Sequence, residues 1–179
     1  LALLTSGYDK QDSITTTSGL GGTPAFMAPE MATGPIDKID KASDIYLLGA
    51  TLFMIITGKP PHHAKNVTQC LQAVRSNKIR EVPEHLHDEL MDVALKAMST
   101  DPEERYENVE SFQQAIREYR SHAESILLST RASDDLNQGK QNQSYADLSR
   151  AAFRFEESIK FWEQNERARQ GLAETKIVH

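Results

Sequence analysis

The residues of this sequence that could take part in chemistry begin with a run of hydroxyl side chains. Four neighbours could accept a phosphate group: Thr15, Thr16, Thr17 and Ser18. They lie in a segment of Gly, Ser, Thr, Asp and Gln without an apolar period, which is typical of a mobile loop. An added phosphate can order such a loop against basic groups. Taken alone, the same run favours a solvated linker over a phosphorylated loop.

A glycine-rich stretch, Gly19-Leu20-Gly21-Gly22, follows these hydroxyls and resembles half of a phosphate-cradling loop. The next residues are Thr23-Pro24, whereas a P-loop continues with Lys and then Ser or Thr. We therefore do not expect a nucleotide cradle here.

Histidines and one cysteine raise the question of a metal site. No matching carboxylate cluster accompanies His62-His63 or His85-Leu86-His87, so we expect histidines on the surface and no bound metal. Cys70 falls on an apolar helical position beside Leu71 and is expected to be a small buried hydrophobe. A single cysteine excludes an internal disulfide framework.

The most apolar stretch of the chain, residues 43–58, predicts a central helix of about four turns that is buried on several sides. Ser43 or Asp44 can cap its start, Gly58 can supply a left-handed residue after its end, and Pro60-Pro61 prevent continuation. From the residues alone, Asp44 is either a cap or an anchor for a neighbouring backbone. The helix is too short to span a bilayer.

Three further helices are predicted after this one. Residues 66–76 and 85–99 each place apolar side chains on one helical face. Asp101, followed by Pro102 and Glu104, is a helix-start signature, and an apolar face follows over residues 109–119.

Composition limits the classes of partner. The 179 residues are 39% hydrophobic, with a net charge of −6 and a pI near 5.5. No dense Lys/Arg stripe is visible, which argues against a nucleic-acid surface. The apolar start, Leu1-Ala2-Leu3-Leu4, lacks the basic leader and long core of a signal peptide. We expect a cytoplasmic protein with no membrane segment in this chain.

Four motifs occur in a familiar order and spacing: Gly22-Thr23-Pro24-Ala25-Phe26-Met27-Ala28-Pro29-Glu30, Asp44-Ile45-Tyr46-Leu47-Leu48-Gly49, Thr57-Gly58-Lys59-Pro60-Pro61 and Asp101-Pro102-Glu103-Glu104-Arg105-Tyr106. Together they resemble the large lobe of eukaryotic-type serine/threonine protein kinases, from the end of the activation segment onward, with Phe26 in place of the usual Tyr. The resemblance covers residues 1–120. It implies an all-α chain that holds helices F to I of that lobe.

The resemblance also implies roles for single residues. Asp44 would anchor the catalytic loop by accepting backbone N–H groups. Thr23 would assist catalysis from the substrate-side loop. Its presence favours a kinase that phosphorylates serine or threonine over a tyrosine kinase. Glu30 and Arg105 would form a buried structural ion pair. Phosphorylation within residues 15–18 would activate the complete kinase, which would use ATP and Mg and act on a protein substrate.

The other motifs of a kinase occur nowhere in the sequence: the glycine-rich loop over ATP, the strand lysine, His-Arg-Asp and Asp-Phe-Gly. Leu1-Ala2 resembles the residues that follow Asp-Phe-Gly. We therefore expect a piece of a kinase that is inactive alone and binds neither ATP nor Mg. The alternative is a non-catalytic helical interaction module derived from a kinase lobe.

Residues 121–179 resemble a tetratricopeptide repeat, whose pairing with a kinase is more familiar from bacteria. The repeat's small and aromatic positions match Ala151, Phe155, Ser158 and Leu172-Ala173. Its usual proline is replaced by Glu163, and polar residues occupy expected apolar sites at Asp135, Gln138 and Asn142. A plain amphipathic tail is the alternative. We expect this extension to be helical and to bind a protein partner rather than nucleic acid.

The central helix would lack part of its cover if the first half of a kinase is missing. An apolar face of several hundred Å² carries on the order of 10 kcal/mol of drive toward burial. We expect it to be covered by a second copy of the chain in a homodimer, by the C-terminal helices, or by a segment containing Leu1, Leu3 and Leu4.

Overall fold

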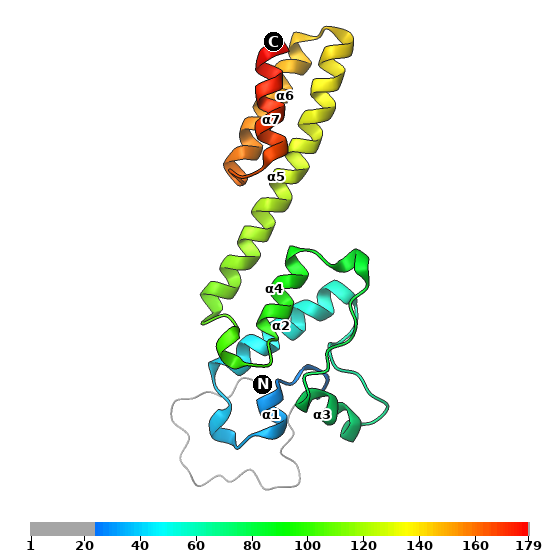
Figure 1. The fold of residues 1–179 in the computed structure, drawn as a ribbon, viewed down its shortest axis with the longest axis vertical. Coiled ribbons are helices and arrows are strands. Elements are labelled where there is room, and N and C mark those ends of the chain that lie inside the picture. Colours follow the sequence, from blue (N-terminus) through cyan, green and yellow to red (C-terminus); the bar gives the residue numbers. More distant parts are fainter. Residues whose placement is uncertain (1–23, 179) are drawn as a thin grey trace. The chain divides into compact units, whose positions relative to one another are not determined.

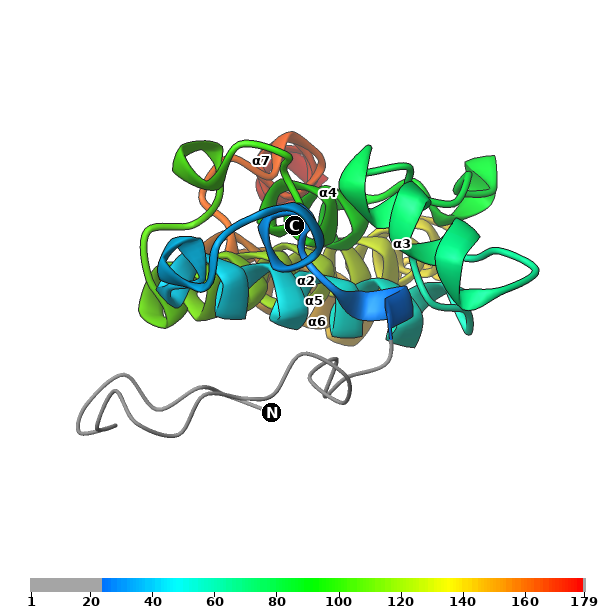
Figure 2. The same cartoon turned by 90° about the horizontal axis from the view of Figure 1, so that it is seen from below.

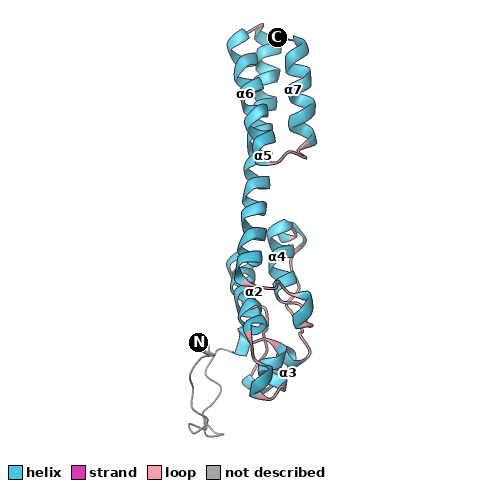
Figure 3. Cartoon of the chain, turned by 90° about the vertical axis from the view of Figure 1, so that its left-hand side faces the viewer, coloured by secondary structure: helices cyan, strands magenta, loops and turns pink. Residues whose placement is uncertain are grey.

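The computed structural model describes residues 24–178, and every regular element in that part of the chain is a helix (Figure 3). The expectation of an all-α protein is confirmed. The chain divides into two compact units, residues 1–115 and 116–179. No helix within the described residues is long and apolar enough to cross a membrane.

The central helix of the first unit is α2, Lys41–Thr57. Its start differs from the prediction, because Asp40 is the cap and accepts the N–H of Ala42 at 2.8 Å. Ser43 is not the cap, since its hydroxyl donates to another side chain, as described below. The predicted end is correct: Gly58 has a left-handed φ of 70°, and its N–H donates to the carbonyl oxygen of Met54.

Helix α4, Glu89–Ala97, lies beside α2 (Figure 1). A Cβ atom at Gly49 would lie 2.6 Å from the Cβ atom of Ala97, so only glycine permits this approach of the two helices. The core between them is formed by Ala28, Tyr46, Ala50, Phe53, Met91, Ala94 and Met98.

Three shorter elements complete this side of the first unit. Helix α1, Pro29–Thr33, lies between the 3₁₀ turns η1, Pro24–Phe26, and η2, Ile36–Lys38. Figure 2 shows η1 beside helix α3, Val67–Arg75, whose start is capped by Asn66. The side chain of Arg75 donates to the carbonyl oxygen of Ala32 at 2.9 Å, which ties α3 to α1.

Two predicted helix starts are shifted along the chain. Residues 85–99 do not form one helix, because a 3₁₀ turn η3, Glu84–Leu86, comes first and Asp88 then caps α4 by accepting the N–H of Met91. Asp101 caps only the 3₁₀ turn η4, Pro102–Glu104. The following helix, α5, begins at Val109.

Three helices carry the second unit: the later part of α5, Val109–Asn142, then α6, Tyr145–Phe161, and α7, Glu166–Val178. Residues 121–142, the start of the extension, belong to α5, as the expected helical structure requires. The core is formed by Ala132, Leu136, Leu148, Ala151, Phe155 and Ala168.

Two glycines allow the helices of the second unit to approach closely. A Cβ atom at Gly139 would lie 2.7 Å from a methyl group of Leu148, and one at Gly171 would lie 2.2 Å from the ring of Phe155. A buried polar cluster adds specific contacts, since the amide of Asn165 donates to the hydroxyls of Ser125, Ser129 and Ser158.

Candidate functional site

Glu30 and Arg105, 75 residues apart in sequence, form a bidentate ion pair. Nη1 and Nη2 of Arg105 donate to Oε1 and Oε2 of Glu30 at 2.7 and 2.9 Å. The side chains are 0% exposed for Arg105 and 11% exposed for Glu30. Glu30 lies in the first turn of α1, and Arg105 directly follows η4. The structure thus brings together the two residues that the sequence motifs pair.

Arg105 also donates to the backbone of two other segments. Nη1 donates to the carbonyl oxygen of Ala42 at 2.9 Å, and Nε donates to that of Ser99 at 2.9 Å. The hydroxyl of Ser43 donates to Oε1 of Glu30 at 2.7 Å. A guanidinium presents its donors in a rigid planar fork. It therefore fixes α1, the start of α2 and the end of α4 relative to one another.

The environment of Glu30 favours its ionised form. Burial alone would raise the pKa of Glu30, but hydrogen bonds from Arg105, its own backbone N–H and Ser43, together with the charge of Arg105, outweigh this effect. The pKa of Glu30 is therefore lowered from its ordinary value. A carboxylate held by donors in this way remains charged at neutral pH.

A buried polar network lies next to the ion pair. The guanidinium carbon of Arg105 lies 5.0 Å from the centroid of the Tyr46 ring. The Tyr46 ring also stacks on the ring of His62. The Tyr46 hydroxyl donates to Oδ1 of Asn77 at 2.6 Å and lies 2.7 Å from Nε2 of His62. Nδ1 of His62 is 3.0 Å from the carbonyl oxygen of Lys78, which can only accept, so this nitrogen carries a proton.

This network corrects the expectation that His62 lies on the surface. The residue is fully buried, and burial lowers its pKa, although the hydrogen bond to Lys78 opposes the shift. Burial also raises the pKa of Tyr46, against the opposing charge of Arg105. Sequence reasoning missed the network, because Tyr46 and Asn77 are 31 residues apart and no local pattern joins them.

The other predicted site residues fall in different places. Asp44 lies in the first turn of α2 and is exposed. Cys70 is buried, as expected. Thr23 and the phosphorylation candidates lie outside the described residues. Within residues 24–178, no group of three or more His, Cys, Asp or Glu side chains could hold a metal ion.

The face of α2 that carries Asp44 also carries apolar side chains. Leu48 and Ile55 follow Asp44 at helical spacing and are 37% and 74% exposed. Met54 is 41% exposed on the adjoining side. An acidic group at one end of an apolar stripe is therefore accessible on the central helix.

Comparison with known proteins places this geometry in a family context. Residues 2–116 match a family described as protein tyrosine and serine/threonine kinase. The chain is 37% identical over 102 residues to the serine/threonine-protein kinase PknB of Mycobacterium tuberculosis. The aligned residues make up 55% of this chain and 16% of that protein. It is 34% identical over 110 residues to the tyrosine-protein kinase MasK of Myxococcus xanthus, covering 60% and 17%. The chain thus spans about a sixth of the length of these curated relatives.

The lowered pKa of Glu30 predicts a pH-dependent contribution to stability. A carboxylate whose pKa is depressed by folding stabilises the fold above its unfolded pKa, and this contribution is lost as the pH falls through the folded pKa. At pH 7, Glu30→Gln should lower the free energy of unfolding by about 3–5 kcal/mol, because a buried guanidinium loses its partner. The loss of unfolding free energy caused by Glu30→Gln should become smaller well below pH 4.5, the ordinary pKa of a glutamate side chain.

Urea unfolding at pH 7 and pH 3 measures this difference. The control is Glu104→Gln, an exposed carboxylate next to Arg105 in sequence, which should change stability by less than about 0.5 kcal/mol. An equal deficit for Glu30→Gln at both pH values would contradict the assignment.

Proposed function

We propose, since this chain belongs to the protein tyrosine and serine/threonine kinase family, that the complete protein transfers the γ-phosphate of ATP to serine or threonine side chains of proteins. The observation that carries the proposal is the bidentate pair between Glu30, at the end of the activation-segment motif, and Arg105, in the Asp101-Pro102 motif. The relatives of this chain include one named as a serine/threonine kinase and one named as a tyrosine kinase. The Gly22-Thr23-Pro24 stretch supports the former class.

Four roles follow for residues of this chain. Asp44 anchors the backbone of the catalytic loop, and its exposure at the start of α2 supports this role. Thr23 helps to orient the catalytic groups from the substrate-side loop. The Glu30–Arg105 pair is structural, because it is buried and its hydrogen bonds join segments that are distant in sequence. Phosphorylation within residues 15–18 activates the enzyme by ordering the loop.

ATP and Mg would serve the complete kinase. The described residues do not fit a magnesium site, since no group of three potential ligands occurs among them, and we derive no step through either group. We propose that residues 1–179 alone neither bind Mg-ATP nor transfer phosphate.

The activity test uses the full-length product of the gene with a generic protein substrate. We expect label on Ser and Thr, and Asp44→Asn should reduce kcat by about 100-fold, a loss of nearly 3 kcal/mol in transition-state stabilisation. The control is Lys41→Gln, which replaces an exposed residue in the same helical turn and should retain activity.

Several outcomes would contradict the proposal. Label on tyrosine alone would refute the substrate class, and full activity of Asp44→Asn would refute the anchor. A full-length protein without transfer activity would favour the non-catalytic interaction module. Tight binding of Mg-ATP to residues 1–179 in calorimetric titration would contradict the inactivity of the isolated chain.

We also propose that residues 121–179 form a tetratricopeptide-like unit that binds a protein partner rather than nucleic acid. Of the repeat-like residues, Ala151, Phe155 and Ser158 are buried on one face of α6, whereas Leu172 is half-buried and Ala173 is exposed. Asp135, at a site expected to be apolar, is buried and bonds to Arg150 and Arg154. A charged cluster thus replaces an apolar contact at that position.

Gly171→Ala distinguishes a packed repeat from a plain amphipathic tail. In a tail, alanine would stabilise helix α7 by about 1 kcal/mol through helix propensity. In the packed unit, the new methyl group collides with Phe155, and overpacking should destabilise the unit by about 1–3 kcal/mol. Thermal unfolding followed by circular dichroism measures the sign, with exposed Gln170→Ala as control. A stabilised Gly171→Ala variant would contradict the repeat-like unit.

A further inference from the structure

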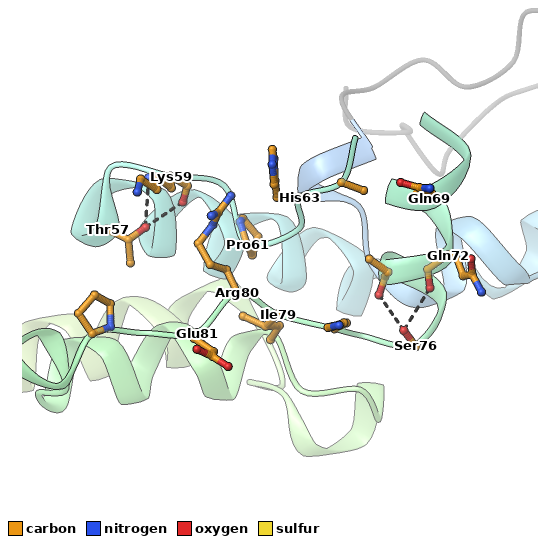
Figure 4. Close-up of a pocket in the computed structure, with 14 residues that line it drawn as sticks. Thr57, Lys59, Pro61, His63, Gln69, Gln72, Ser76, Ile79, Arg80 and Glu81 are labelled. Atoms are coloured by element: carbon orange, nitrogen blue, oxygen red, sulfur yellow. Dashed lines mark hydrogen bonds between the residues drawn. The ribbon is translucent and has the colours of Figure 1, made fainter. Parts of the chain in front are cut away.

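A cleft of about 810 Å³ lies in the first unit (Figure 4), and neither residue of the ion pair lines it. It is bounded by the C-terminal end of α2, the loop that follows, helix α3 and residues 77–83. None of its lining residues has a role in the function proposed above.

The cleft carries positive charge in an acidic protein. Lys59, Lys78 and Arg80 line it, and among its described lining residues the sole acidic side chain is Glu81. The chain as a whole has a net charge of −6. Within residues 24–178, no ion pair engages the ammonium groups of Lys59 or Lys78, both of which belong to exposed residues. A local excess of one sign attracts partners of the opposite sign.

Hydrogen bonds hold the walls of the cleft in place. The backbone N–H of Arg80 donates to the carbonyl oxygen of Pro61 at 2.7 Å, and its Nε donates to that of Pro60 at 3.3 Å. The hydroxyl of Thr57 donates to the carbonyl oxygen of Lys59 at 2.8 Å. The half-buried guanidinium of Arg80 is thereby positioned with its planar fork beside the cleft, a geometry suited to a carboxylate.

The rest of the lining favours a peptide over a small anion. The side chains of Gln69 and Gln72 on α3 and of Ser76 at its C-cap form one wall (Figure 4). Ile79 and Pro83 add apolar surface. Amides and hydroxyls can bond to a peptide backbone, and apolar groups can pack against its side chains. A site for a small molecule is usually mostly apolar and buries most of its ligand. An open, polar and cationic cleft is a poorer match to that description.

We propose that this cleft docks an acidic segment of a protein substrate, rich in Asp and Glu, away from the residue that is phosphorylated. The proposal rests on the proposed kinase function and deepens it by assigning a substrate class. Carboxylates of the segment pair with Lys59, Lys78 and Arg80, while the amides of α3 bond to its backbone.

Binding can be measured without any phosphoryl transfer. Residues 1–179 are titrated into a fluorescein-labelled peptide of about ten residues that alternates Glu with Ala, and fluorescence anisotropy is followed. Exposed charge pairs each contribute about 0.2–1 kcal/mol. At about 0.3–0.7 kcal/mol for each of two pairs, Lys59→Gln combined with Lys78→Gln should weaken binding about three- to tenfold. Lys65→Gln, an exposed lysine of the same loop that does not line the cleft, should leave binding unchanged within about twofold.

Three results would overturn the docking site. One is equal binding of a peptide with Gln in place of Glu, and another is unchanged binding by the double variant. The third is displacement of the peptide by inorganic phosphate or by an oligothymidylate of equal charge at a lower concentration than unlabelled peptide. That displacement would show a general polyanion surface.

A second readout separates this proposal from the kinase function. In the full-length protein, the double variant should raise KM for an acidic protein substrate about three- to tenfold, with unchanged kcat and unchanged transfer to a short neutral serine peptide. Absent transfer with intact peptide binding would overturn the kinase function alone. Intact transfer with unchanged KM would overturn the docking site alone.

Discussion

The buried pair of Glu30 and Arg105 is the interaction on which the first unit depends. Transfer of two charges from water costs several kcal/mol per ion, and the cost is offset only if the remaining donors and acceptors are satisfied. Here they are, because Arg105 also donates to the carbonyl oxygens of Ala42 and Ser99, and Glu30 accepts from Ser43. Segments distant in sequence are therefore joined at one guanidinium.

This constraint extends from the ion pair to the opposite side of the core. The ring of Tyr46 contacts Arg105. The hydroxyl of Tyr46 contacts Asn77 and His62. Asn77, whose φ of 45° is left-handed, donates in turn to the carbonyl oxygen of Met98 at 2.9 Å. Because His62 bonds to the carbonyl of Lys78, the same network supports the backbone beside the cationic cleft. The polar network beside the ion pair and the proposed docking cleft therefore share one residue, Lys78.

Local signals in the sequence predicted much of this fold, whereas contacts across the chain were harder to foresee. Gly58 and Asn66 end and begin helices as their residue types indicate. Asp40 rather than Ser43 caps α2, because the Ser43 hydroxyl donates to Glu30, a contact over 13 residues that no local pattern predicts. The burial of His62 depends on Tyr46, 16 residues away. The packing role of Gly139 depends on Leu148 across a turn, which helical periodicity alone does not reveal.

A double-mutant cycle with Glu30→Met and Arg105→Met tests the central claim most directly, by urea unfolding at pH 7. Each single change should cost about 3–5 kcal/mol, because it leaves one charge buried without its partner. The double variant should be little worse than either single variant, giving a coupling energy of at least about 2 kcal/mol. Costs that simply add, with a coupling energy below about 0.5 kcal/mol, would contradict the view that this pair holds the unit together.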